Sequence, residues 1–202
     1  MFRLLSFLYP SLIWQMPGKE KIIYLSFDDG PIPEVTPWVL EQLKKRNAKA
    51  TFFCIGDNAK KHPAILRQIT EEGHAIGNHT YHHLNGWKTK NPDYFNDIDL
   101  ARKLIPSKLF RPPYGKIRVS QISVLKKEYR IVMWDVLSKD YDNTLDGDDC
   151  YKRVVNSTRS GSIVVFHDSL KAEARLRVAL PKVLDHFFRS WISVCRFECF
   201  II

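Results

Sequence analysis

The sequence predicts an α/β protein with a mostly parallel sheet. Short apolar segments typical of buried strands alternate with segments of helical periodicity along the chain. The connections between them are short, and polar residues stand where several apolar segments end. Alternation of this kind favours βα units around a parallel sheet, and both a barrel and an open sheet satisfy it.

The first two predicted units extend to Gly73. Residues 21–27, KIIYLSF, are typical of a buried strand, and a helix is expected to start near Thr36 and Pro37, because Thr can cap a helix and Pro suits its first turn. Residues 50–55, ATFFCI, predict the second strand. Residues 62–73, HPAILRQITEEG, predict a helix for which Gly73 is the stop signal.

The later elements follow the same alternation. HAIGNH predicts a short strand, and NPDYFNDIDLARKLI predicts a helix with an Asn cap, Pro in the first turn and early Asp residues. Further strands are expected at LFR, RIVMW and SIVVFH. Further helices are expected at SQISVLKKEY, DDCYKRVVNSTR and AEARLRVALPKVLDHFFR.

The length of 202 residues suits one domain with a substantial core, expected over residues 21–202 after an apolar N-terminal segment of residues 1–20. The opening MFRLLSFLYPSLIW is too short to span a bilayer, and no small-residue cleavage site follows it, so it is not a convincing signal peptide. It can pack against the domain or make a peripheral membrane or cell-wall contact. The expected location is a bacterial-type cell envelope or the cytoplasm.

The net charge of +9 would favour an acidic partner. The Lys and Arg residues are nevertheless scattered among acidic ones, without an aromatic-interleaved basic motif, so nucleic-acid binding is not expected. Cys54 lies in an apolar segment and is expected to be a core thiol. Cys195 and Cys199 could form a bridge in an oxidising compartment, which the sequence does not decide.

Several polar residues lie at or just beyond the carboxyl ends of predicted strands. Parallel α/β sheets and barrels place their catalytic groups at this edge. The residues are Asp28, Asp29, His79, Arg111, Asp135 and His167.

The adjacent carboxylates of SFDDG, Asp28 and Asp29, point in opposite directions in an extended segment, so one could bind a metal while the other faces substrate or water. Both could also be solvated turn residues. His79 and His83 are four residues apart and share a face if the segment is helical, whereas His82 points elsewhere. Together with Asp29 they would supply one oxygen and two nitrogen ligands to a catalytic metal. Zinc bound in this way lowers the pKa of its water to about 7, which would make Asp28 a credible general base.

Two further residues have an expected role. Arg111 precedes a rigid double proline and could orient a carboxylate. His167 ends a fully apolar strand, where it is either satisfied in the core or exposed at the strand end. In company with the other site residues, general acid is the favoured interpretation for His167.

These segments resemble, in order, the motifs of the NodB-homology family of polysaccharide deacetylases, also called carbohydrate esterase family four. SFDDG is similar to the first motif, HTYHH to its His-Ser/Thr-x-x-His metal motif, RPPY to Arg-x-Pro-Tyr, and VFH to the motif of the catalytic acid. The resemblance extends from about Lys21 to about Leu184. It implies a distorted (β/α) barrel, in which the domain of residues 21–202 would be a NodB-homology domain.

The resemblance also implies roles for individual residues. Asp28 would be the catalytic base, Arg111 would orient it, and His167 would be the acid. Asp29, His79 and His83 would bind the metal, most favourably Zn²⁺, with Co²⁺ or Ni²⁺ as alternatives. The Tyr114 amide would help bind the oxyanion, and Val165 would line the acetyl pocket.

The chain departs from the family at the fourth motif, Asp-x-x-Asp followed by Trp or Tyr. Here WDVLSKDY supplies Asp140 and Tyr141 but has Leu137 at the position of the leading Asp, which normally pairs with the acid histidine. We therefore expect Asp135 as a candidate replacement.

The function implied is removal of N-acetyl groups from N-acetylglucosamine-type sugars in a glycan, either chitooligosaccharide or peptidoglycan. An O-acetyl esterase acting on xylan could use the same site. An iron oxygenase shares the two-His, one-carboxylate ligand set but leaves Asp28, Arg111 and His167 without roles. A catalytically impaired glycan-binding module is the non-enzymatic alternative. The natural glycan and the oligomeric state are not readable from the sequence.

Overall fold

The computed structural model describes residues 6–17, 21–189 and 193–195. Its centre is a curled sheet of eight parallel strands in the order β5-β4-β3-β2-β1-β7-β6, with β8 pairing the first half of β1. The strands are β1 Ile22–Asp28, β2 Thr51–Cys54, β3 Ala75–Asn78, β4 Leu109–Phe110, β5 Arg130–Ile131, β6 Val136–Leu137, β7 Ile163–His167 and β8 Ser193–Cys195. This is the distorted barrel that the resemblance to the NodB-homology family implied.

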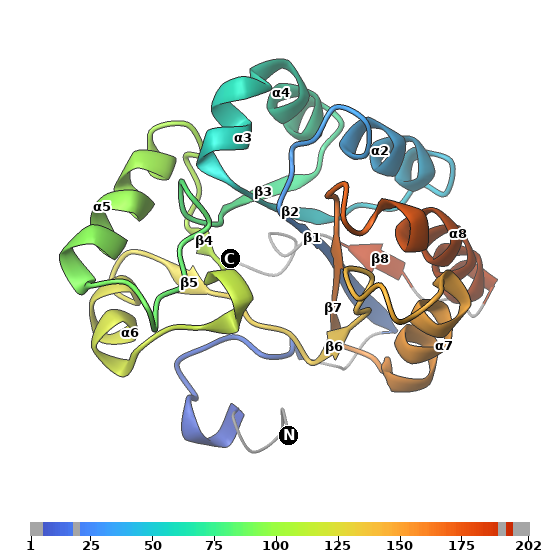
Figure 1. Cartoon of the computed structure of the whole chain (residues 1–202). Coiled ribbons are helices and arrows are strands. Elements are labelled where there is room, and N and C mark those ends of the chain that lie inside the picture. The colour runs from blue at the N-terminus through green and yellow to red at the C-terminus, as the bar shows by residue number, and fades with distance from the viewer. Residues whose placement is uncertain (1–5, 18–20, 190–192, 196–202) are drawn as a thin grey trace.

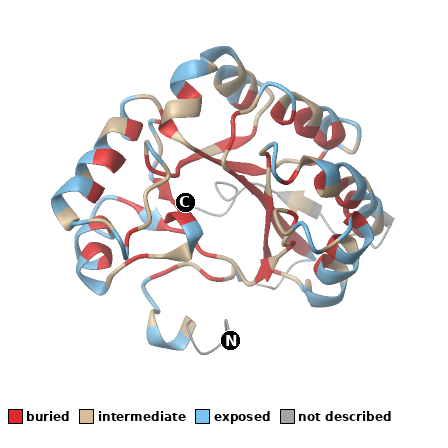
Figure 2. Cartoon of the chain, in the orientation of Figure 1, coloured by how far each residue is buried: buried red, intermediate tan, exposed pale blue. Residues whose placement is uncertain are grey.

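The helices form a ring around the outside of the sheet (Figure 1). They are α2 Thr36–Lys44, α3 Gly56–Lys61, α4 Pro63–Glu71, α5 Asn91–Arg102, α6 Val119–Leu125, α7 Gly147–Ser157 and α8 Glu173–Arg189, with a 3-10 turn η1 Pro113–Gly115. Figure 2 shows buried residues on their inner sides and exposed residues on their outer sides. Each predicted helix is present, and the short polar α3 is an addition that its sequence did not suggest.

The side chains of strand β1 contribute to both the core and the candidate site. Alternate residues point to opposite faces of a strand. Ile23, Leu25 and Phe27 pack in the cluster beneath the helices, whereas Tyr24 belongs to a second cluster inside the curled sheet. Ser26 and Asp28 continue the inner row, so two polar residues replace apolar ones at the carboxyl end of this row. The interior is therefore apolar at its amino end and polar at its carboxyl end.

Two predicted helix caps are wrong. The N-cap of α2 is Val35, and the Thr36 hydroxyl instead accepts from the Ile32 amide and donates to Asp168 Oδ2 at 2.6 Å. The N-cap of α5 is Lys90, and Asn91 makes side-chain hydrogen bonds to the segment carrying α6. Both polar side chains are used for tertiary contacts, which sequence propensity does not report.

The N-terminal segment packs on the domain at residues 12–14. Ile13 forms a parallel bridge with Val132 beyond β5, and Leu12 and Trp14 are buried in a cluster with residues of α5 and α6. Phe7 and Leu8 are exposed, and a membrane or cell-wall contact through them stays a prediction. Among the described residues, no helix has the length and apolar character needed to cross a membrane.

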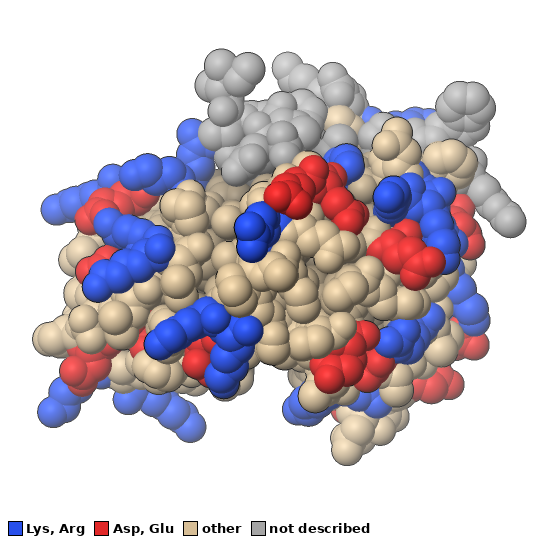
Figure 3. Space-filling view, turned by 90° about the horizontal axis from the view of Figure 1, so that it is seen from above, with Lys and Arg blue, Asp and Glu red and all other residues tan. Residues whose placement is uncertain are grey.

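Charge and cysteines follow the sequence-based expectations where the structure describes them. Positive and negative side chains are interspersed over the face drawn in Figure 3. Cys54 is buried as a free thiol, and burial raises its pKa well above the ordinary value. Cys150 is also buried and free. Cys199, which could form a bridge with Cys195, lies outside the described residues.

Candidate active site and metal centre

The candidate site lies at the carboxyl ends of four strands. Asp28 and His167 are the last residues of β1 and β7, and they are register partners in adjacent strands. His79 directly follows β3, and Arg111 directly follows β4. Four segments distant in sequence therefore deliver their polar residues to one end of the sheet, where parallel α/β folds place catalytic groups.

Asp29, His79 and His83 form a cluster whose ligand atoms all lie within 4.8 Å of one another. Asp29 Oδ1 lies 3.3 Å from His83 Nε2 and 3.8 Å from His79 Nε2. Neighbouring ligands of a tetrahedral zinc ion, each about 2.0 Å from the metal, are about 3.3 Å apart. His79 Nδ1 lies 2.7 Å from the Arg111 carbonyl oxygen, which accepts a hydrogen bond from Nδ1–H and leaves Nε2 free to ligate. The donor set therefore fits a divalent metal.

The protonation states in this cluster also suit a metal. Burial lowers the pKa of His79 to about 4, so its imidazole is neutral near pH 7. Burial alone would raise the pKa of Asp29, but the hydrogen bond with His83 and the charge of His167 hold it below its ordinary value. A neutral imidazole and an ionised carboxylate are the forms that ligate.

The segment carrying His79 and His83 is not helical. Both residues lie in the loop after β3, and Thr80 and His83 have φ of 61° and 57°. Asp29 has φ of 83°, and Tyr114 has φ of 59°. The histidines therefore converge through left-handed turns rather than through the shared face of a helix. Non-glycine residues in this region are uncommon, and they concentrate at functional sites.

Arg111 is fully buried and holds Asp28. Its Nη1 donates to Asp28 Oδ1 at 2.7 Å and to Ser26 Oγ at 2.8 Å. Its remaining guanidinium nitrogens donate to the carbonyls of Val132 and Met133, and the Phe53 ring lies 4.0 Å from its centre. Burial lowers the pKa of Arg111, whereas the charge of Asp28 raises it. A buried cation needs such a set of partners, and here it fixes the carboxylate in one orientation.

The partner of His167 is Asp140, not Asp135. His167 Nδ1 donates to Asp140 Oδ1 at 2.7 Å, and the His167 amide donates to Asp140 Oδ2 at 2.8 Å. Burial would lower the pKa of His167, but the charge and hydrogen bond of Asp140 raise it to about 9. The second Asp of the fourth motif therefore provides the pairing, and Leu137 in the leading position does not leave the acid without a carboxylate.

Asp135 lies at the opposite end of the barrel. Strand β5 ends at Ile131, so Asp135 precedes β6 instead of ending a strand. Its carboxylate accepts from the Ile163 amide at 2.7 Å and from the Ser162 hydroxyl at 2.9 Å, next to the amino end of β7. The expectation that Asp135 pairs with the acid histidine or lies on the substrate side is therefore wrong. Burial raises the pKa of this carboxyl.

Tyr114 lies beside His83 of the cluster, and Val165 lies on β7 two residues before His167. The Tyr114 ring centre is 4.6 Å from that of His83, and its side chain is exposed. Tyr114 belongs to the turn η1, in which its own backbone is left-handed and not helical. Val165 is buried on β7 opposite Ser26, in the inner row that ends at His167.

The sequence did not identify three carboxylates around this site. Asp140 was named in the fourth motif but was not paired with His167. No role was assigned to Asp97 on α5 or to Asp168 after β7. Asp97 accepts hydrogen bonds from the loop between His79 and His83, and Asp168 accepts from Gly30 beside Asp29. The available signal for Asp168 was a charged residue directly after an apolar strand.

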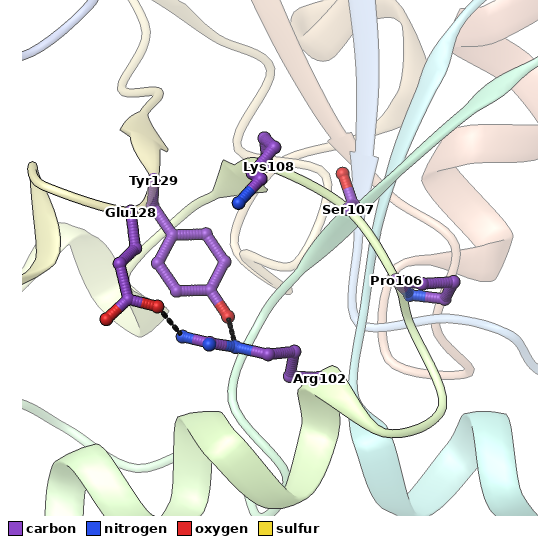
Figure 4. Close-up of a pocket in the computed structure, with 6 residues that line it drawn as sticks. All are labelled: Arg102, Pro106, Ser107, Lys108, Glu128 and Tyr129. Atoms are coloured by element: carbon purple, nitrogen blue, oxygen red, sulfur yellow. Dashed lines mark hydrogen bonds and ion pairs between the residues drawn. The ribbon is translucent and has the colours of Figure 1, made fainter.

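A separate pocket of about 270 Å³ lies away from this chemistry (Figure 4). It is bordered by residues that precede β4 and β5, hence at the amino ends of these strands, and by Arg102. The Arg102 side chain already contacts Tyr129, Glu128 and Asp99. We therefore assign the candidate site to the metal cluster and not to this pocket.

The family model of polysaccharide deacetylase matches residues 15–130, which include Asp28, Asp29, His79, His83 and Arg111. The chain belongs to the polysaccharide deacetylase family. Membership agrees with the curled parallel barrel and with the residues gathered at its carboxyl end.

Relatives in the polysaccharide deacetylase family are similar over most of the chain. A peptidoglycan-N-acetylglucosamine deacetylase of Bacillus cereus is 36% identical over 178 residues, covering 85% of this chain and 84% of the relative. A chitooligosaccharide deacetylase of Azorhizobium caulinodans is 38% identical over 157 residues, covering 74% of each. The crystal structure of a peptidoglycan N-acetylglucosamine deacetylase matches with a TM-score of 0.90 at 30% identity, covering 96% of this chain and 94% of that one.

Proposed function

We propose that this protein is a metal-dependent hydrolase that removes N-acetyl groups from glucosamine-type sugars in a glycan. The observation that carries the proposal is the arrangement around Asp29, His79 and His83. Next to this cluster lie a carboxylate held by a buried arginine and a histidine whose raised pKa keeps it protonated. The names of the peptidoglycan and chitooligosaccharide deacetylases that it resembles support the substrate class.

The proposed roles follow from the partners of each residue. Asp28 accepts a proton from the attacking water, and Arg111 fixes its carboxylate for this task. His167 donates its proton to the sugar nitrogen as the amide C–N bond breaks, and Asp140 keeps that proton available near neutral pH. The Tyr114 amide donates to the oxyanion of the tetrahedral intermediate, and Val165 lines the space for the acetyl methyl group.

Asp29, His79 and His83 would hold the metal, for which we propose Zn²⁺. The same ligands accept Co²⁺ and Ni²⁺. When bound, such a metal supplies polarisation of the acetyl carbonyl and increases the acidity of water.

The test is acetate release by the purified protein from N-acetylglucosamine oligomers and from peptidoglycan, with chelator and after zinc is restored. Release that stops with chelator and returns with zinc supports the proposal. Acetate from acetylated xylan alone would favour the O-acetyl esterase. Binding of N-acetylated glycan without acetate from any substrate would favour a glycan-binding module and refute the proposed activity.

A further inference from the structure

We propose that Asp168 and Asp97 are positioning residues that hold the two ligand-bearing loops in the conformation that binds metal. Neither belongs to the cluster of Asp29, His79 and His83. Each is buried behind it and contacts the backbone of one loop. The inference rests on the proposed function only in that the cluster binds a metal.

Asp168 forms hydrogen bonds with the backbone on both sides of Asp29. Its Oδ1 accepts from the Gly30 amide at 3.0 Å, and its own amide donates to the Asp28 carbonyl at 3.0 Å. Its Oδ2 accepts from the Thr36 hydroxyl at 2.6 Å, which ties the carboxylate to the start of α2. Asp29 lies between Asp28 and Gly30 and has φ of 83°. A non-glycine residue keeps this conformation only when its surroundings impose it.

Gly30 shows how closely Asp168 fits this loop. A Cβ added to Gly30 would lie 2.0 Å from Asp168 Oδ2 and 2.5 Å from its Cγ. The missing side chain therefore makes room for the carboxylate, and the backbone can approach it directly. A side chain introduced at position 30 would push the loop away from the Asp168 carboxylate and displace Asp29.

Asp97 has the same relation to the histidine loop. Its Oδ2 accepts from the amides of Tyr81 and His82 at 2.8 and 2.9 Å, and its Oδ1 lies 2.5 Å from His82 Nδ1. These residues lie between the two histidine ligands. Thr80 and His83, at either end of this stretch, have left-handed φ values. Asp97 therefore fixes the turn that points both Nε2 atoms toward Asp29.

Removal of the groups that orient metal ligands typically weakens metal binding by about tenfold to a hundredfold. We expect Asp168→Ala and Asp97→Ala each to raise the zinc dissociation constant by about this factor. Asp168→Asn and Asp97→Asn keep an acceptor oxygen for the loop amides and are expected to restore most of the affinity. The measurement is competition for zinc between the metal-free protein and a chromophoric chelator, which needs no substrate.

Asp135→Ala is the matched control. Asp135 also accepts from one backbone amide and one hydroxyl, but it does so at the opposite end of the barrel. Its loss is expected to lower the melting temperature and leave zinc affinity unchanged. A purely structural role for Asp168 and Asp97 would give the same pattern as this control.

If an Ala variant does not fold, Thr36→Val and His82→Ala loosen the two carboxylates without removing them. These variants are expected to lose zinc affinity, by no more than about tenfold. Folded Ala variants, or these milder ones, that bind zinc like the wild type would overturn the inference while leaving the metal site in place. A wild-type protein that binds no zinc, cobalt or nickel would overturn both. A wild-type protein that binds zinc but releases no acetate from any substrate would contradict only the proposed activity.

Discussion

Replacing Asp140 with Asn should move the alkaline limb of activity to lower pH. His167 must be protonated to donate a proton, so activity falls as pH rises through its pKa. Asp140 is the main influence raising that pKa from 6.5 to about 9, and burial acts in the opposite direction. Without the charge of Asp140, the pKa is therefore expected to fall to 6.5 or below.

The magnitude follows from the protonated fraction. At pH 7.5, a pKa of about 9 leaves roughly 97% of His167 protonated, whereas a pKa of 6.5 leaves roughly 9%. The kcat of Asp140→Asn at this pH should drop at least about tenfold, with less loss at pH 6. A bound divalent cation repels an imidazolium, so the limb of the metal-loaded wild type should lie below pH 9.

The assay is kcat against pH, accompanied by NMR titration of His167 in the metal-free protein. Asp135→Asn is the control, because it makes the same chemical change at a carboxylate that does not contact His167. An alkaline limb that stays in place in Asp140→Asn, or that moves equally in Asp135→Asn, would refute the reasoning.

Three further predictions concern the proposed base and acid, the packing at Gly30 and the N-terminal segment. Asp28→Asn and His167→Ala should each lower kcat by about 10²- to 10⁴-fold in folded protein, measured as acetate release; unchanged turnover in both would exclude them as base and acid. Gly30→Ala should lower the free energy of unfolding by about 1–3 kcal/mol, because its Cβ would overlap Asp168; denaturant unfolding measures this, and wild-type stability would contradict the packing. Trp14→Ala should cost about 3–5 kcal/mol in the same assay, because Trp14 is buried although it precedes the predicted domain. Phe7→Ala, at an exposed position, is its control.

The sequence located most of the site because strong local signals coincide there. Asp28 and His167 interrupt apolar strands at their ends, and a polar residue in that position has few explanations. The fold class was equally accessible, since alternating strands and helices leave few architectures. Strand β6 and helix α3 escaped prediction because they are short, and their residues show no clear periodicity.

The hydrogen-bond partners of individual side chains could not be predicted from the sequence. Asp140 reaches His167 because the chain turns back after β6, with Lys139 at φ of 60°, and no glycine marks this turn. The loop of His79 and His83 shares its four-residue spacing with a helix, so the spacing could not distinguish the two. Thr36 and Asn91 carry cap-forming side chains, but Thr36 donates to the distant Asp168, and Asn91 bonds to the segment that carries α6. In each case a tertiary contact outweighs a local preference.

The three metal-ligating candidates come from two loops that only the complete sheet brings together. An unfolded chain would hold Asp29 far from His79 and His83, so metal should bind the native state in strong preference. By mass action, free metal at a thousand times its dissociation constant would then add about 4 kcal/mol to the free energy of unfolding. Metal supply would thus govern how long the protein survives heat or proteolysis, and a chelator would expose it to degradation even where no substrate is present.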